Sequence, residues 1–341
     1  MNPRLLLAAL ALTTTVATGA ATLATPATPA EAASRTARTA FVTPAEAAPR
    51  TVRTTSVTPA ESAAPAKRRF HEYVALGDSW SANVTVLGID HTYAPVGCAQ
   101  SSWNYPKQVA ARLGVKVFRD ATCGGATTAE MTKPQEVGSA LLLTQGVNPA
   151  QFDRLTPTTD LVTLGIGGND AELVSAVLGC ISPLPAPLAD ACRTRFAAPG
   201  GKDLMSQRIA AVKPRITSVL AGIHQRSPRA TVLVVDYLAG VAADRGCYPT
   251  VPIQDQDLTW FGARLKELNG MLASAAAEGG ARFVDTYRGS VGHDICKPDG
   301  TRWVEGLVPM SSNPPGPAVP FHPNRLGADH QAATVLAELG S

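Results

Sequence analysis

The stretch YVALGDSWSA, residues 73–82, places a glycine, an aspartate and a serine directly after an apolar run that is typical of a buried strand. Gly, Asp and Ser are common turn residues. A serine hydroxyl is also a useful nucleophile when a neighbouring base takes its proton. The stretch alone therefore leaves two interpretations open: an ordinary turn, or a turn that exposes Ser79 for catalysis.

Among the six histidines, His322 is the strongest candidate for such a base. It lies in VPFHPNRLGADH, between Phe321 and Pro323 and just before a predicted helix. Pro323 restricts the backbone on that side of the histidine. A single histidine in such a place is more often a packed or surface residue, so this signal needs support from others.

Acyl transfer to a serine also needs hydrogen-bond donors aimed at the developing oxyanion. In TCGGATT, residues 122–128, Gly124 and Gly125 lack the side chain that would keep a backbone N–H away from a ligand. In GGND, residues 167–170, Asn169 offers a side-chain amide just after an apolar run. Each stretch alone is more simply a turn, and the predicted fold decides whether they act together.

Five apolar runs rich in β-branched residues alternate with stretches of helical character. The predicted strands are 72–77, 115–121, 160–168, 231–237 and 281–287, and the predicted helices are 103–113, 203–226, 255–278 and 325–339. This alternation predicts an α/β fold, a three-layer α/β/α sandwich around a five-stranded parallel sheet. Loops at the carboxyl ends of such strands meet at one edge. GDSW, TCGGATT and GGND follow the first three strands, so we expect them to lie together.

These blocks, in the order GDSW, CGGATT, GGND and FHPN, resemble the SGNH, or GDSL-type, hydrolase superfamily, in particular its secreted actinobacterial esterases and lipases. The resemblance covers about residues 70–341. It implies the flavodoxin-like SGNH fold and a serine ester hydrolase without metal or organic cofactor. It also implies that Ser79 is the nucleophile and His322 the general base, with the oxyanion hole formed by the N–H groups of Ser79 and Gly125 and the side chain of Asn169.

Two positions depart from the family pattern. Trp80 replaces the usual leucine, and we expect it to form part of an apolar substrate wall with the segment 306–320, unless it is only a core aromatic. Val319 replaces the usual aspartate of the triad. We therefore predict a dyad in which a backbone carbonyl, of Val319 or Pro320, orients His322. The alternative is a carboxylate from elsewhere, and the candidates are Asp294 and Asp329.

The first 69 residues differ in character from the rest of the chain. Arg4 precedes an apolar run of about eight residues, which predicts a secretory signal peptide over 1–33. An uncleaved anchor that holds the protein at the cell surface is the alternative. Residues 34–69 repeat TPAEAA or TPAESA and are rich in Ala, Pro and Thr, so we predict a linker or pro-segment, with the hydrolase domain over 70–341. Lys67–Arg69 is either a processing site or a solvated charge run.

All six cysteines lie after residue 70, and none forms a C-x-x-C pair. An even number behind a signal peptide favours three disulfides over a metal site. Fifteen pairings are possible, and the pairing of neighbours along the chain ranks first: Cys98 with Cys123, Cys180 with Cys192, and Cys247 with Cys296. A thiol hydrolase built on Cys123 is disfavoured for the same reason.

The charge of the predicted domain limits its partners. The whole chain carries a formal charge of +3, but residues 70–341 contain 22 Lys and Arg against 24 Asp and Glu. Nucleic-acid binding therefore lacks an electrostatic basis. We expect a monomer that acts on a small-molecule or lipid ester, with transient contact to a lipid surface. An O-acetyl esterase for polysaccharide or cell-wall glycan, and a non-catalytic surface protein with the same fold, stay as alternatives.

Overall fold

Five parallel strands form the central sheet of the computed structural model, in the order β2-β1-β5-β8-β9. Their bounds are Glu72–Gly77 for β1, Val117–Asp120 for β2, Leu161–Gly165 for β5, Thr231–Val235 for β8 and Arg282–Val284 for β9. The predicted α/β fold with a five-stranded parallel sheet is confirmed. The order also shows the expected crossovers, since β1 lies between β2 and β5.

The structure describes residues 69–139, 144–185, 188, 191–242 and 244–341. The predicted signal peptide and nearly all of the predicted linker lie outside these residues, so their boundaries stay predictions. All described residues belong to one compact unit, Ala63–Ser341. Within the described part of the chain, no helix has both the length and the apolar character needed to cross a bilayer.

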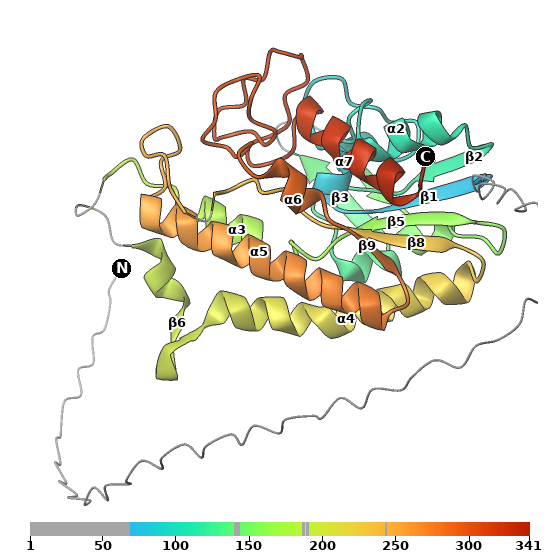
Figure 1. Ribbon diagram of the computed structural model, residues 1–341, viewed down its shortest axis with the longest axis horizontal. Coiled ribbons are helices and arrows are strands. Elements are labelled where there is room, and N and C mark those ends of the chain that lie inside the picture. Colours follow the sequence, from blue (N-terminus) through green and yellow to red (C-terminus); the bar gives the residue numbers. More distant parts are fainter. Residues whose placement is uncertain (1–68, 140–143, 186–187, 189–190, 243) are drawn as a thin grey trace, which may run out of the picture. The chain divides into compact units, whose positions relative to one another are not determined.

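Helices cover both faces of the sheet (Figure 1). On one face lie α4 and α5, and on the other lie α2 and α7. The α-helices are α1 Ser79–Ala82, α2 Tyr105–Leu113, α3 Leu173–Leu178, α4 Leu204–Arg226, α5 Asp255–Glu278, α6 Thr286–Ser290 and α7 Arg325–Glu338. Side chains alternate across a strand, so β1 contributes Val74 and Leu76 to one core and Tyr73 and Ala75 to the other. Burial of both faces explains why the strands read as continuous apolar runs.

Several predicted elements are longer than the observed ones. The strand predicted at 160–168 ends at Gly165, because the chain turns at Gly167, whose φ is +121°. The helix predicted from residue 103 begins at Tyr105, after Asn104 caps it by accepting the N–H of Lys107. The prediction missed the hairpin of β3 Gln135–Ser139 and β4 Thr144–Asn148, the pair β6 Ala197–Ala198 and β7 Lys202–Asp203, and the short helices α3 and α6.

Three disulfides join the six cysteines in the pairing that ranks first from the sequence. They link Cys98 with Cys123, Cys180 with Cys192 and Cys247 with Cys296. The loops that they close span 25, 12 and 49 residues respectively. None of the six cysteines lies in a strand, so the three bonds restrain loops and short 3-10 turns that the strands do not hold.

We predict that the three disulfides stabilise the fold in the order of their loop lengths. In the chain-entropy model, removal of the Cys247–Cys296 bond should lower the free energy of unfolding by about 4 kcal/mol and removal of the Cys180–Cys192 bond by about 3 kcal/mol. The measurement is denaturant unfolding of the two Cys→Ser double variants. An equal or reversed order would show that local structure, rather than loop entropy, sets their contribution.

Candidate active site

Ser79 is the first residue of the one-turn helix α1, directly after strand β1. Asp78 caps this helix by accepting the N–H of Trp80 at 2.9 Å. Gly77 makes the turn possible, because a Cβ at this position would lie only 2.5 Å from Ser81 Oγ and 2.6 Å from the carbonyl oxygen of Gly165. The local sequence GDS thus ends the strand and starts a helix within two residues.

His322 lies against Ser79 although 243 residues separate them in the chain. The distance from His322 Nε2 to Ser79 Oγ is 2.8 Å. The distance from His322 Nδ1 to the carbonyl oxygen of Pro320 is also 2.8 Å. A carbonyl can only accept, so Nδ1 carries the proton, and the lone pair of Nε2 is free to accept the hydroxyl proton of Ser79.

The carbonyl that faces the imidazole is therefore that of Pro320. The carbonyl of Val319, the other predicted candidate, instead accepts the backbone N–H of His322 at 3.2 Å. The two candidate carboxylates are used elsewhere: Asp294 accepts the N–H of Cys296, and Asp329 accepts hydrogen bonds from Gln108 and Arg325. The structure brings Ser79, His322 and Pro320 together and leaves both aspartates out.

Burial governs the protonation of His322. Its side chain, in the loop before α7, is only 7% exposed. Loss of hydration lowers the pKa of His322 to about 4, and the hydrogen bond to Pro320 opposes this shift only in part. The imidazole is therefore neutral around pH 7, which is the form that can accept a proton.

We predict that activity persists well into the acid range. The competent form of His322 is the neutral one, and activity is lost as the pH falls through its pKa of about 4. With an ordinary histidine pKa of about 6.5, less than about a tenth of the enzyme would be competent at pH 5.5. The measurement is the acid limb of kcat/KM against pH, with thermal unfolding at each pH as the control for stability. An acid limb centred near 6.5 would contradict the prediction.

Two backbone N–H groups, those of Ser79 and Gly125, have no acceptor among the described residues. Gly125 is exposed and has a φ of +76°, a left-handed conformation that favours glycine. Both groups are therefore free to donate to an incoming oxygen, as an oxyanion hole requires.

The third predicted donor, Asn169, comes from the loop after β5. Its Nδ2 donates one hydrogen bond to the carbonyl oxygen of Ala126 at 2.9 Å, which leaves the second N–H of the amide available. Asp170 fixes the same two loops by accepting the backbone N–H of Thr128 at 3.0 Å and its hydroxyl at 2.5 Å. The loops that hold Gly125 and Asn169 are thus bonded to each other.

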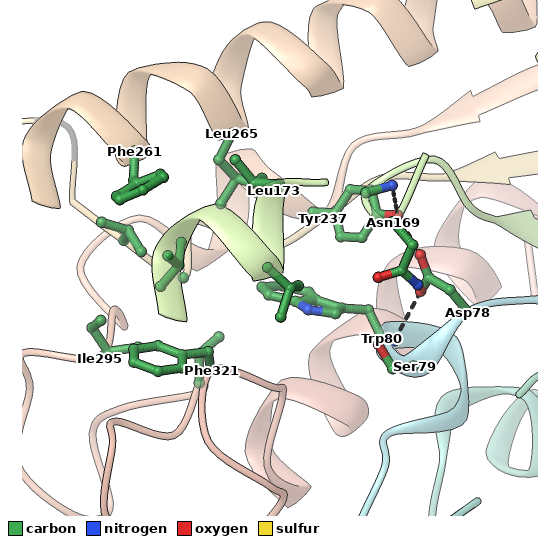
Figure 2. A pocket seen from close by; sticks show the side chains of 16 residues that line it. Asp78, Ser79, Trp80, Asn169, Leu173, Tyr237, Phe261, Leu265, Ile295 and Phe321 are labelled. Atoms are coloured by element: carbon green, nitrogen blue, oxygen red, sulfur yellow. Dashed lines mark hydrogen bonds between the residues drawn. The ribbon is translucent and has the colours of Figure 1, made fainter. Parts of the chain in front are cut away.

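An apolar pocket with a volume of about 610 Å³, its open mouth included, begins at Ser79. Asp78, Ser79 and Asn169 supply its polar side chains at one end, next to Tyr237, and the rest of the wall is apolar. In Figure 2, Ser79 and Phe261 lie at opposite ends of the lining and Trp80 lies between them. The apolar wall consists of Trp80, Leu173, Val174, Val177, Val241, Phe261, Leu265, Ile295, Val304 and Phe321 with Gly168 and Gly240.

Trp80 lies where both interpretations given to it above place it, but no residue of the segment 306–320, the other predicted part of the wall, lines the pocket. It is half-buried and packs against the larger of the two cores. Its ring meets that of Tyr237 edge to face at 5.3 Å between centroids. It also lines the pocket, so the same side chain stabilises the fold and shapes the wall.

Sequence reasoning missed Asp170 and Tyr237. Asp170 follows Asn169 in GGND, so its position after a strand was a usable signal, whereas Tyr237 stands in an apolar run that gives no hint of a role. For metals, the described residues contain no cluster of three or more His, Cys, Asp or Glu side chains that could hold an ion.

The chain resembles known proteins both in sequence and in fold. The sequence model of the GDSL-like lipase/acylhydrolase family matches residues 75–330. The chain is 36% identical to lipase 2 of Streptomyces coelicolor over 284 residues, which cover 82% of this chain and 89% of the lipase. It is 29% identical to an esterase of Streptomyces scabiei, covering 78% of this chain and 85% of the esterase. The extracellular lipase of Streptomyces rimosus has a similar fold, with a TM-score of 0.61, 24% identity, and coverage of 78% and 99% of the two chains.

Proposed function

Because this chain belongs to the GDSL-like lipase/acylhydrolase family, a family of carboxylic ester hydrolases, we propose that it is a secreted serine esterase or lipase that forms an acyl-enzyme on Ser79. The observation that carries the proposal is the pair of 2.8 Å contacts that His322 makes with Ser79 Oγ and with the carbonyl oxygen of Pro320. These contacts supply a base in the required tautomer beside the nucleophile.

The proposed reaction has two steps, formation of the acyl-enzyme and its hydrolysis. His322 Nε2 takes the hydroxyl proton as Ser79 Oγ attacks the ester carbonyl, and the carbonyl oxygen becomes an oxyanion. The protonated imidazole gives that proton to the leaving alcohol, which departs and leaves the acyl group on Ser79. A water molecule repeats the sequence, with its proton taken by His322 and returned to Ser79 as the acid is released.

The Ser79 and Gly125 N–H groups and the Asn169 amide are the proposed donors to the oxyanion. They come from the ends of three neighbouring strands, β1, β2 and β5. Such donors cost no reorganisation during the reaction, because the loops already hold them in place. This role is supported by the two backbone N–H groups of Ser79 and Gly125, which have no acceptor among the described residues.

The pocket supports an apolar acyl group as the part of the substrate that binds beside Ser79. The described residues of the lining form a polar end at Asp78, Ser79 and Asn169, with the hydroxyl of Tyr237 beside them, and supply no other charged side chain. The lining therefore suits a hydrocarbon chain better than a sugar. This favours fatty-acyl esters over O-acetyl groups.

The direct test is hydrolysis of p-nitrophenyl esters from acetate to dodecanoate by the purified protein and by Ser79→Ala. We expect kcat/KM to rise with acyl length up to a limit, because each methylene group transferred to an apolar pocket contributes about 0.8 kcal/mol. Equal hydrolysis by wild type and Ser79→Ala would refute the proposed function. A maximum at acetate would support an O-acetyl esterase instead.

Filling the pocket is expected to shorten the preferred acyl chain. Val177 on α3 lines the pocket and is 7% exposed, whereas its neighbour Leu178 is 49% exposed and lies outside the lining. Val177→Phe should lower kcat/KM for the decanoyl ester about 10-fold or more, with the acetyl ester changed less than about threefold. Leu178→Phe is the matched control and should leave the profile unchanged. The same loss for both esters in Val177→Phe would argue against an acyl pocket here.

Secretion is part of the same proposal. The relative from Streptomyces rimosus is described as extracellular, the chain contains three disulfides, and its first 33 residues have the layout of a signal peptide. Expression of the full chain in an actinobacterial host, followed by N-terminal sequencing of the protein in the medium, tests both export and the cleavage site.

A further inference from the structure

One hydroxyl outside the catalytic set joins the two loops on either side of the proposed oxyanion hole. Tyr237, just after β8, donates from Oη to Asp78 Oδ2 at 2.5 Å and accepts the N–H of Gly168 at 2.7 Å. Asp78 precedes Ser79, and Gly168 precedes Asn169. The Tyr237 hydroxyl is therefore one residue away from a proposed oxyanion donor on each side.

The backbone of Tyr237 is fixed by hydrogen bonds to the side chain of Asn269. Its N–H donates to Asn269 Oδ1 at 3.2 Å, and Asn269 Nδ2 donates to its carbonyl oxygen at 2.7 Å, so helix α5 fixes its backbone. Both residues are buried. The close contact also explains the glycine at position 168, where a Cβ would lie 3.0 Å from Tyr237 Oη. In Figure 2 the Tyr237 side chain lies beside Asn169 and Asp78.

We propose that Tyr237 is a positioning residue that sets the spacing between the Ser79 and Asn169 donors of the oxyanion hole. This inference rests on the proposed function. The two donors come from different strands, β1 and β5, and each donor must meet the same oxygen atom at hydrogen-bond distance. Both bonds of the Tyr237 hydroxyl are used within the protein, so it acts through its neighbours rather than on the substrate.

The first test is Tyr237→Phe, which keeps the ring and removes only the hydroxyl. We expect kcat for a short-chain p-nitrophenyl ester to fall about 10- to 100-fold, with KM changed less than about twofold, because small displacements of catalytic donors cost rate rather than binding. Tyr73→Phe is the matched control. Tyr73 is also buried and bonded, through Oη to Thr163 Oγ1 at 2.7 Å, but it lies in the core on the other face of the sheet. Its kcat should not change.

A double-mutant cycle shows whether Tyr237 acts through the donors. Asn169→Ala removes one of the two donors whose spacing Tyr237 is proposed to set. In the Asn169→Ala background, Tyr237→Phe should therefore lower kcat less than about threefold further. If the kcat loss of the double variant instead equalled the product of the two single-variant losses, Tyr237 would act independently of the Asn169 donor, and the proposal would be wrong.

A third variant separates positioning from stability. Burial raises the pKa of Asp78 to about 7, and the hydrogen bond from Tyr237 lowers it, so Tyr237→Phe leaves a buried carboxyl with one donor fewer. Asp78→Asn/Tyr237→Phe replaces that carboxyl by a neutral amide and still lacks the bond to Gly168. We expect kcat to stay low even where the melting temperature recovers. Recovery of both would overturn the proposal.

The Ser79→Ala and Tyr237→Phe results together distinguish failure of this inference from failure of the proposed function. Hydrolysis by wild type that persists in Ser79→Ala would refute the proposed function, and the inference with it. Hydrolysis that depends on Ser79 but is undiminished in Tyr237→Phe would refute the inference alone.

Discussion

Alanine in place of Ser79 or His322 is expected to lower kcat by about 10⁴- to 10⁶-fold, and the two changes together should cost little more than either one. The expectation follows from the 2.8 Å contact between Ser79 Oγ and His322 Nε2. Nucleophile and base act as one unit, so the loss of either stops the same step. The measurement is kcat for a p-nitrophenyl ester, with melting temperatures to confirm that the variants are folded.

Asn in place of Asp294 or Asp329 is expected to cost little activity. A triad carboxylate fixes the tautomer of the histidine and stabilises its charged form. Here the carbonyl oxygen of Pro320 occupies that place, 2.8 Å from His322 Nδ1. Asp294 instead accepts the N–H of Cys296, and Asp329 accepts hydrogen bonds from Gln108 and Arg325. A carbonyl can orient the ring as well as a carboxylate can, but it carries no full charge to stabilise the imidazolium.

The aspartate variants decide between a dyad and a triad. A loss of about 10³- to 10⁴-fold in a folded Asp294→Asn or Asp329→Asn variant is the scale of a disabled triad carboxylate, and it would replace the dyad by a recruited acid. Pro320 itself cannot be tested by a side-chain change, because its carbonyl is part of the backbone. The absence of an effect at both aspartates is therefore the informative result.

The strands and the long helices could be predicted because burial on both faces leaves a strong pattern in the sequence. Strand β1 and helix α5 were predicted to the residue, at 72–77 and 255–278. The site followed from topology: Ser79, Gly125 and Asn169 stand after the first three strands, and parallel strands bring those loops to one edge. His322 could be singled out locally by its place between Phe321 and Pro323 before a predicted helix, but its role as the base needed the family resemblance.

The remaining features depend on contacts between distant residues, which leave no local pattern. Whether Val319 or Pro320 faces the imidazole depends on the turn that the backbone makes before His322. The role of Tyr237 depends on α5 and on two loops that lie 69 and 159 residues away in the chain. Helix α3 is only six residues long and begins at Leu173, too short for its apolar period to stand out.

Removal of the Asn169 amide is the second change with a large expected effect. Asn169→Ala should lower kcat about 10²- to 10³-fold, the scale observed for loss of one oxyanion-hole donor, and should leave KM nearly unchanged. We expect kcat to fall without a change in KM because the amide donates to a charge that develops in the transition state and that the bound ester does not yet carry. The measurement is the pair kcat and KM for a short-chain ester, together with the melting temperature.

Asn169→Asp distinguishes the missing donor from the missing volume. Aspartate fills the same space, but its carboxylate accepts hydrogen bonds and donates none, and a negative charge beside the oxyanion adds repulsion. We therefore expect Asn169→Asp to lose at least as much kcat as Asn169→Ala. If Asn169→Asp instead kept most of the activity that Asn169→Ala lost, the side chain would matter for filling the loop next to Ala126, where its Nδ2 now donates at 2.9 Å. The oxyanion would then depend on the Ser79 and Gly125 N–H groups alone.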